Sequence, residues 1–475
     1  MPSQEAAALA NALGGGEASL LEELDLSKNG RVVVGENGEL EGEGGAIQLP
    51  ANAVSSSRVT HLTRLRLNEF SDLPSDSVRS LFQAMADGKT PDLRTIEVSV
   101  SDSDEGVRYD EAVDAFAVMV REGGIPRIEQ IRLDFHIGDL RSAPMSSLGR
   151  ALGSGAASSL RELKLKWFCD GDDENPEGGV AGLAEGLGGG GMPFLEDLDL
   201  EVMFPDDGEG GEGGSELGEV LSTGKAPSLR HVRLGWPATQ LLSTLCQGLC
   251  VGSSPPPMMR LEMDFKHVTS NSEIPLSRLA QTILSGRLSY LRKLSTSLIL
   301  PFAELTRPFA ELGGALTHSG ASMAFLEEVS IHFVRQATKE AFVEALHRGP
   351  SRLPSLRTLG TFGERPSASC LAPLIARGQV SSLSEVKLKL GETDIKGIQA
   401  LAMSLGSPHA ASLRKMEIEF ELCVSLASPH LTRLQSLLVS GVADVSAVLS
   451  VCAGLESGKL SSLSELTFYW VTRLE

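Results

Sequence analysis

A pattern of three apolar residues, spaced as in Leu21, Leu24 and Leu26, recurs from the start of the 475-residue chain to its end. The last two residues of each copy are two positions apart, so in an extended segment they share one face and the residues between them share the other. About fifteen such copies tile the chain, which indicates stacked repeats that bury a continuous core. The further copies are Leu62/Leu65/Leu67, Leu93/Ile96/Val98, Ile128/Ile131/Leu133, Leu160/Leu163/Leu165, Leu195/Leu198/Leu200, Leu229/Val232/Leu234, Met258/Leu261/Met263, Leu291/Leu294/Thr296, Leu326/Val329/Ile331, Leu356/Leu359/Thr361, Leu383/Val386/Leu388, Leu413/Met416/Ile418, Leu434/Leu437/Val439 and Leu463/Leu466/Phe468.

A helical pattern precedes most copies. Val78, Leu81, Phe82 and Met85 fall at i, i+3, i+4 and i+7, and Gly88 follows them as a stop signal. Each repeat is therefore predicted to hold one strand and one helix. Because repeat arrays grow by adding units, a single elongated domain over residues 1–475 is expected. Residues 30–57 interrupt the pattern and are predicted to form a small hairpin.

The copy at residues 21–29 has the form L-x-x-L-x-L-x-x-N, which resembles the leucine-rich repeat. Units long enough for a full helix are similar to the ribonuclease-inhibitor-like class of that family. The resemblance implies an α/β horseshoe, a solenoid with parallel strands on the concave face and helices on the convex face. The ninth position departs from the family, because Asn29 is followed by Phe70, Ser101 and His136 in the next units. We therefore expect looser turns after the strands and no regular asparagine ladder.

The net charge, the cysteines and the apolar runs of the chain limit which partners, metal sites and locations are expected. The chain has 42 Lys+Arg against 62 Asp+Glu, a net charge of −20, which disfavours a general nucleic-acid or anionic-membrane surface and permits a protein partner. Of the six cysteines, Cys246 and Cys250 are four apart on a predicted helix, and buried thiols are favoured over a metal site. No targeting segment or membrane-length apolar run is present, so a cytoplasmic protein is expected, with a nuclear location as the alternative.

The predicted concave positions carry charges that alternate in sign from strand to strand. One interpretation is a set of ion pairs between neighbouring strands. The other is a mixed-charge surface that binds a protein, and the two can hold together. The candidate residues are Lys164 and Lys166, then Asp197, Asp199 and Glu201, then Arg233, then Glu262 and Asp264.

Aromatic residues recur one position beyond the outward ones. By alternation they share the parity of the buried leucines, so core packing at the strand ends is favoured. The alternative is a row of binding anchors at the rim, for which Trp167 and Trp236 are the candidates. The series is Phe135, Trp167, Trp236, Phe265, Phe333, Phe420 and Trp470.

Two acidic segments, 170–177 and 204–216, follow predicted strands. Asp170, Asp172 and Asp173 do not match a calcium loop, since the sixth position is Asn175 and the twelfth is Ala181. Solvated loops are favoured, and with Asp206 and Asp207 they are expected to form a negative rim for a basic partner. No metal, cofactor or catalytic residue is predicted, because no nucleophile, phosphate-loop or zinc-protease motif occurs.

The sequence thus predicts a non-enzymatic scaffold that binds a protein through the concave face or the acidic rim. Two alternatives follow from the resemblance. One is a GTPase-activating protein, an activity found in one branch of this class, for which the sequence offers no matched arginine motif and only the generic Arg64 and Arg66. The other, a separate alternative, is the sensor or substrate-binding part of a larger receptor or ubiquitin-ligase adaptor. The last predicted strand, from Leu463, has no polar cap after it, so association through that edge is a further prediction.

Overall fold

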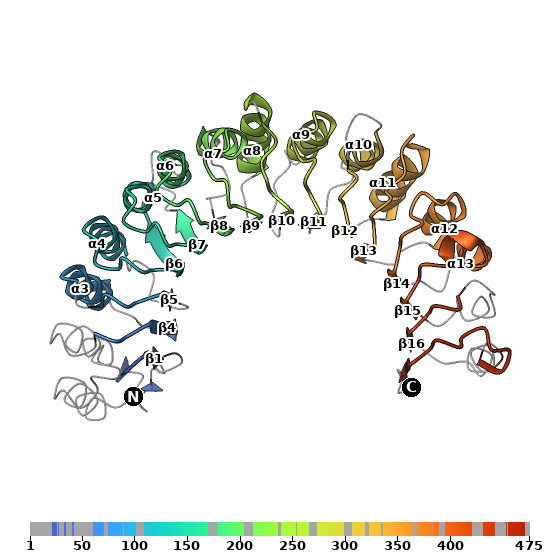
Figure 1. The fold of residues 1–475 in the computed structure, drawn as a ribbon, viewed down its shortest axis with the longest axis horizontal. Coiled ribbons are helices and arrows are strands. Elements are labelled where there is room, and N and C mark those ends of the chain that lie inside the picture. Colours follow the sequence, from blue (N-terminus) through green and yellow to red (C-terminus); the bar gives the residue numbers. More distant parts are fainter. Residues whose placement is uncertain are drawn as a thin grey trace. The chain divides into compact units, whose positions relative to one another are not determined.

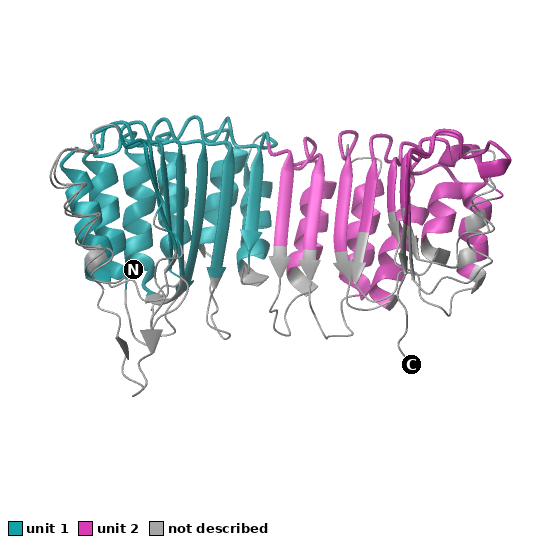
Figure 2. Ribbon diagram, turned by 90° about the horizontal axis from the view of Figure 1, so that it is seen from below, with its two compact units in different colours: residues 1–257 teal, residues 258–475 magenta. Residues whose placement is uncertain are grey.

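The structure is a computed structural model of the chain. It describes residues 21–25, 27, 33–34, 40–41, 60–70, 75–88, 90–100, 109–169, 178–203, 212–235, 239–252, 254–265, 273–298, 306–318, 323–333, 336–363, 368–388, 395–419, 431–441, 453 and 455–470. The chain divides into two compact units, residues 1–257 and 258–475 (Figure 2), and each is described by itself.

Unit 1 is a parallel sheet whose strands follow one another in sequence order, with helices alternating along the chain. Helices and strands form two layers, with the helices on one face of the sheet (Figure 1). The strands are β1 (Glu23–Asp25), β4 (Arg64–Phe70), β5 (Thr95–Val100), β6 (Gln130–Leu140), β7 (Glu162–Cys169), β8 (Asp197–Met203) and β9 (His231–Gly235). The helices are α3 (Ser75–Ala86), α4 (Asp110–Arg121), α5 (Ser142–Gly153), α6 (Gly178–Gly188), α7 (Glu212–Ser222) and α8 (Thr239–Val251).

Unit 2 repeats this plan. Its parallel strands are β10 (Arg260–Phe265), β11 (Lys293–Leu298), β12 (Glu328–Phe333), β13 (Thr358–Gly363), β14 (Glu385–Leu388), β15 (Lys415–Glu419), β16 (Ser436–Gly441) and β17 (Glu465–Trp470). Its helices are α9 (Glu273–Leu284), α10 (Thr306–Thr317), α11 (Gln336–Arg348), α12 (Ala368–Ala376) and α13 (Ile395–Leu405), followed by the short 3₁₀ turn η2 (Pro408–Ala410).

The repeated apolar residues form the core between sheet and helices. In β4 to β6, Leu65, Ile96 and Ile131 are fully buried and stand opposite one another in register. The helices present a matching stripe, since Val78, Leu81, Phe82 and Met85 of α3 are also fully buried, as their spacing predicts. Burial of each such side chain contributes about 1.5–3 kcal/mol.

Glycines end several helices and let the chain turn back into the next strand. Gly123 follows α4 with φ of 75°, a left-handed conformation that costs glycine little. Its N–H donates to the Val120 carbonyl at 3.0 Å, which closes the last turn. These turns before the strands lie along one edge of each unit (Figure 2).

The predicted fold class is confirmed as an α/β repeat with an open parallel sheet alternating with helices. Within residues 30–57, β2 (Val33–Val34) pairs antiparallel with β3 (Leu40–Glu41). The turns that were expected to be loose, such as 101–108, lie outside the described residues. Of the cysteines, Cys246 is buried as expected and Cys250 is exposed. No helix in the described ranges has the length and apolarity to cross a membrane.

The outermost strand of unit 2 differs from the strands inside the sheet. β17 pairs in parallel with β16, and its Leu466 is 37% exposed, whereas the equivalent Leu437 of β16 is fully buried. Association through this edge stays a prediction, as does the single-domain assignment.

Candidate functional site

The outward positions of the strands in unit 1 carry the predicted site residues. Lys164 and Lys166 on β7 face away from the helices, because Leu165 between them is buried in the core. The parallel register sets Lys164 opposite Asp199 and Lys166 opposite Glu201 on β8. The repeat thus brings residues about 35 positions apart in sequence into direct lateral contact.

Opposite charges on neighbouring strands form ion pairs across this face. Lys166 Nζ lies 3.0 Å from Glu201 Oε1, and Arg233 Nη1 lies 3.4 Å from Asp199 Oδ2. The interpretation of the alternating charges as pairs between strands therefore holds in unit 1. Further pairs are Arg66–Glu97 at 3.3 Å and Arg132–Glu162 at 2.8 Å, and His231 Nδ1 lies within hydrogen-bond distance of Asp197 Oδ1 at 2.8 Å.

Two carboxyl groups on this face differ in their ionisation. Glu162 accepts hydrogen bonds from Nε and Nη2 of Arg132 at 3.1 and 2.8 Å and lies 3.0 Å from Lys164 Nζ. Although burial opposes ionisation, the bonds from Lys164 and Arg132 hold the pKa of Glu162 below its usual range. For Asp199, burial outweighs the attraction of Arg233 and Lys164 and raises the pKa. The face therefore combines a firmly ionised carboxylate with one that takes up a proton more readily.

A shallow groove of about 260 Å³ lies on the face across β4 to β8. Its polar lining mixes both signs of charge with neutral hydrogen-bonding groups, so it can donate and accept hydrogen bonds along its length. Glu97 is buried there and accepts a hydrogen bond from Asn68 Nδ2 at 3.2 Å. The lining polar residues are Asn68, Glu97, Ser99, Arg132, Asp134, Lys164, Lys166, Asp199 and Glu201.

The predicted site residues of unit 2 pair in the same way. Glu262 on β10 lies 3.1 Å from Lys293 Nζ on β11, which also lies 3.3 Å from Glu328 on β12. Burial opposes the charge of Lys293, but these two carboxylates together raise its pKa. Asp264 belongs to β10, and its side chain is outside the described residues.

Trp167 does not belong to the binding surface. Its side chain has no exposed area, because β-strand alternation turns it into the core. The ring lies against α6 at Gly179, where an added Cβ would sit 3.3 Å from Trp167 Cζ2. Phe135 is likewise buried, so the core interpretation of the aromatic series holds at these two residues and Trp167 is removed from the candidate site.

Trp236 and the acidic-rim residues Asp170, Asp172, Asp173, Asp206 and Asp207 lie outside the described residues.

Arg64 and Arg66, the side chains available to a GTPase-activating protein, lie 3.6 and 3.5 Å from Glu23. In the described ranges, no group of three or more His, Cys, Asp and Glu side chains is arranged to hold a metal ion.

A second row of charges, on the turns just before the strands, was missed by sequence reasoning. From Arg94 to Arg230, the residue after the first apolar position of each copy alternates between Arg and Glu, which is the signal that identifies the row. Each residue of the row is joined to the next by a backbone hydrogen bond, as Glu129 N is to Arg94 O at 2.8 Å. Pairs at this edge are Arg94–Glu129 at 3.1 Å, Arg127–Asp92 at 2.5 Å and Arg161–Glu196 at 2.6 Å.

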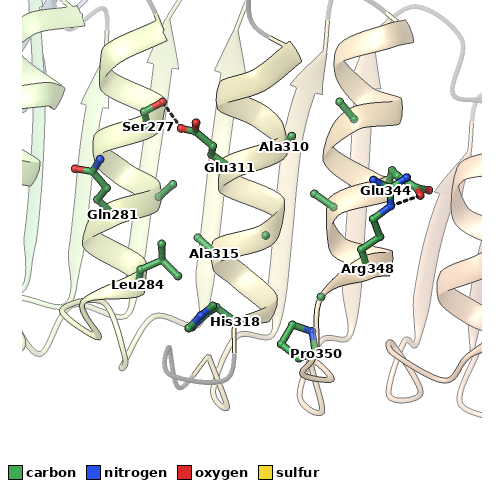
Figure 3. Close-up of a pocket in the computed structure, with 15 residues that line it drawn as sticks. Ser277, Gln281, Leu284, Ala310, Glu311, Ala315, His318, Glu344, Arg348 and Pro350 are labelled. Atoms are coloured by element: carbon green, nitrogen blue, oxygen red, sulfur yellow. Dashed lines mark hydrogen bonds and ion pairs between the residues drawn. The ribbon is translucent and has the colours of Figure 1, made fainter.

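A larger groove, of about 720 Å³, lies on the helix face of unit 2 over α10, between α9 and α11 (Figure 3). Its lining includes the small residues Ala310 and Gly314 of α10. The carboxylates Glu311 and Glu344 are already paired, with Arg307 and Arg348, so they offer little recognition of a ligand. These contacts are Ser277–Glu311 at 2.5 Å, Arg307–Glu311 at 2.9 Å and Arg348–Glu344 at 2.8 Å.

Comparison with known proteins adds no identity to this geometry. No model of a protein family matches the chain, and no curated protein matches it significantly.

Proposed function

We propose that the chain is a non-enzymatic scaffold that binds a partner protein through the outward face of β4 to β8. The observation that carries this proposal is the 260 Å³ groove on an open sheet face, lined by charges of both signs. Such a surface offers complementary contacts to a protein segment, whereas small-molecule sites are usually enclosed and mainly apolar.

The ion pairs support binding by fixing the shape of the face. Glu162 holds both Arg132 and Lys164, so these long side chains lose little further freedom when a partner docks. The resemblance of the leucine pattern to ribonuclease-inhibitor-like leucine-rich repeats supports the same function. The proposed cytoplasmic location rests on the sequence alone.

Filling the groove tests the proposal without removing an ion pair. Ser99→Arg adds a long side chain inside the groove, and Ser158→Arg adds the same group on an exposed turn of unit 1 as a matched control. The unaltered chain and the Ser158→Arg control should capture the same partner protein from cell extract. The amount captured by Ser99→Arg should be at least about tenfold lower, as for loss of a central contact. Equal recovery with Ser99→Arg, at unchanged thermal stability, would place the partner elsewhere.

A further inference from the structure

The turns before the last five strands of unit 2, β13 to β17, form a strip of positive charge. From the turn before β13 to the turn before β17, residues 349–357, 376–384, 406–414, 431–435 and 457–464 contain no carboxylate. The strip is named the basic rim and consists of Arg352, Arg357, Arg377, Arg414, Arg433 and Lys459. All five arginines are exposed and Lys459 is partly exposed.

The backbone keeps these turns side by side. Arg357 N donates to Glu327 O at 2.7 Å, Ser384 N donates to Arg357 O at 2.8 Å, and Arg414 N donates to Ser384 O at 2.8 Å. Arg357 and Arg414 therefore stand two strand spacings apart, roughly 10 Å. A ligand that follows the edge of the sheet meets one cation after another.

The basic rim differs from the equivalent turns of unit 1. There, Arg94, Arg127 and Arg161 each pair with a carboxylate on a neighbouring turn. In unit 2, Glu327 pairs with Arg292 at 3.3 Å, and no ion pair forms at the six rim cations within the described part of the chain. Their charge is therefore not neutralised at the surface.

Two exposed aromatic residues precede the basic rim on the same edge. Tyr290 and Phe325 sit one residue before the first apolar position of adjacent repeats and are 48% and 51% exposed. Aromatic and arginine side chains are the residue types that contribute most to protein interfaces. The edge thus offers apolar contact at one end and positive charge along the rest.

We propose that this edge of unit 2 binds an acidic segment of a partner protein that also carries an apolar residue. Arginine forks bind carboxylates through two parallel hydrogen bonds, and five of the six cations are arginines. A nucleic acid or an anionic membrane is larger than the strip, so most of its negative charge would face the rest of a chain with net charge −20 and be repelled by it. A short acidic segment is attracted locally, within a Debye length of about 8–10 Å.

Binding of a defined peptide to the full chain tests the inference. The probe is a fluorescent Glu/Asp-rich peptide with one Phe, and its Gln/Asn version is the uncharged control. The acidic peptide should bind, and Arg357→Glu with Arg414→Glu should raise its Kd by about tenfold or more. Arg121→Glu with Lys225→Glu, an equal charge change at exposed sites of unit 1, should change Kd by less than about twofold.

Further variants keep the outcome decisive. Arg357→Gln with Arg414→Gln removes charge without introducing repulsion and should also weaken binding, with circular dichroism confirming the fold. Ser99→Arg should bind the peptide unchanged, since this edge acts independently of the groove on unit 1. Equal binding of the Gln/Asn peptide would overturn the inference, as would tighter binding of single-stranded RNA or phosphatidylserine vesicles.

Discussion

Thr296 occupies a core position on β11 where most other copies have Leu, Ile or Val. It is 2% exposed, and its Oγ1 has no hydrogen-bond partner in the described part of the molecule. Thr296→Val keeps the shape and removes a buried hydroxyl, so we expect a gain of about 1 kcal/mol in the free energy of unfolding by urea. In the control Thr95→Val, the hydroxyl that contacts Gln130 at 3.3 Å is lost, and no gain is expected. A less stable Thr296→Val protein would contradict this account.

The ion pairs of the outward face also make a prediction for single residues. Lys166 and Glu201 are each about one-fifth exposed, so their attraction is partly screened by solvent. A double-mutant cycle with Lys166→Ala and Glu201→Ala should give a coupling of roughly 0.2–1 kcal/mol in the free energy of unfolding. Zero coupling would mean that the two side chains do not pair in solution.

At the scale of elements, glycine decides how closely neighbouring helices pack. A Cβ at Gly149 of α5 would collide with the backbone of Gly182 and Leu183 on α6, and one at Gly186 would collide with the Gly149 carbonyl. By contrast, a Cβ at Gly314 of α10 meets nothing within 4 Å.

These two environments predict opposite effects of one substitution. Gly149→Ala should lower the free energy of unfolding by about 1–3 kcal/mol through overpacking, and its melting temperature should fall. Gly314→Ala should raise the free energy of unfolding by about 0.5–1 kcal/mol, since alanine favours a helix interior. Destabilisation by both to the same extent would show that helix contact is not the cause.

Strands were predictable from sequence because leucines two apart define both the extended segment and its buried face. The pair Lys166–Glu201 was predictable as well, because parallel register aligns equivalent positions of successive repeats. The bridge from Glu162 to Arg132 runs diagonally between strands and depends on side-chain reach, which spacing does not reveal. The contact of Gly149 with α6 likewise depends on how two helices rotate about their axes.

At the scale of the whole chain, a net charge of −20 conceals an uneven distribution. The outward face and the turns of unit 1 carry ion pairs between neighbouring repeats, whereas none forms at the basic rim of unit 2 within the described part of the chain. The two surfaces therefore suit different recognition, one by shape and hydrogen bonding and the other by charge. Salt is expected to weaken the second more than the first.

Photo-crosslinking from the groove tests the central claim, protein binding by the outward face of β4 to β8, most directly. A photoreactive phenylalanine analogue replaces Ser99 in the groove, or Ser158 on the exposed turn as the control. On irradiation in cell extract, a discrete crosslinked protein is predicted from position 99, and it should be absent from position 158. Crosslinking of the same protein from position 158 and not from position 99 would contradict the account.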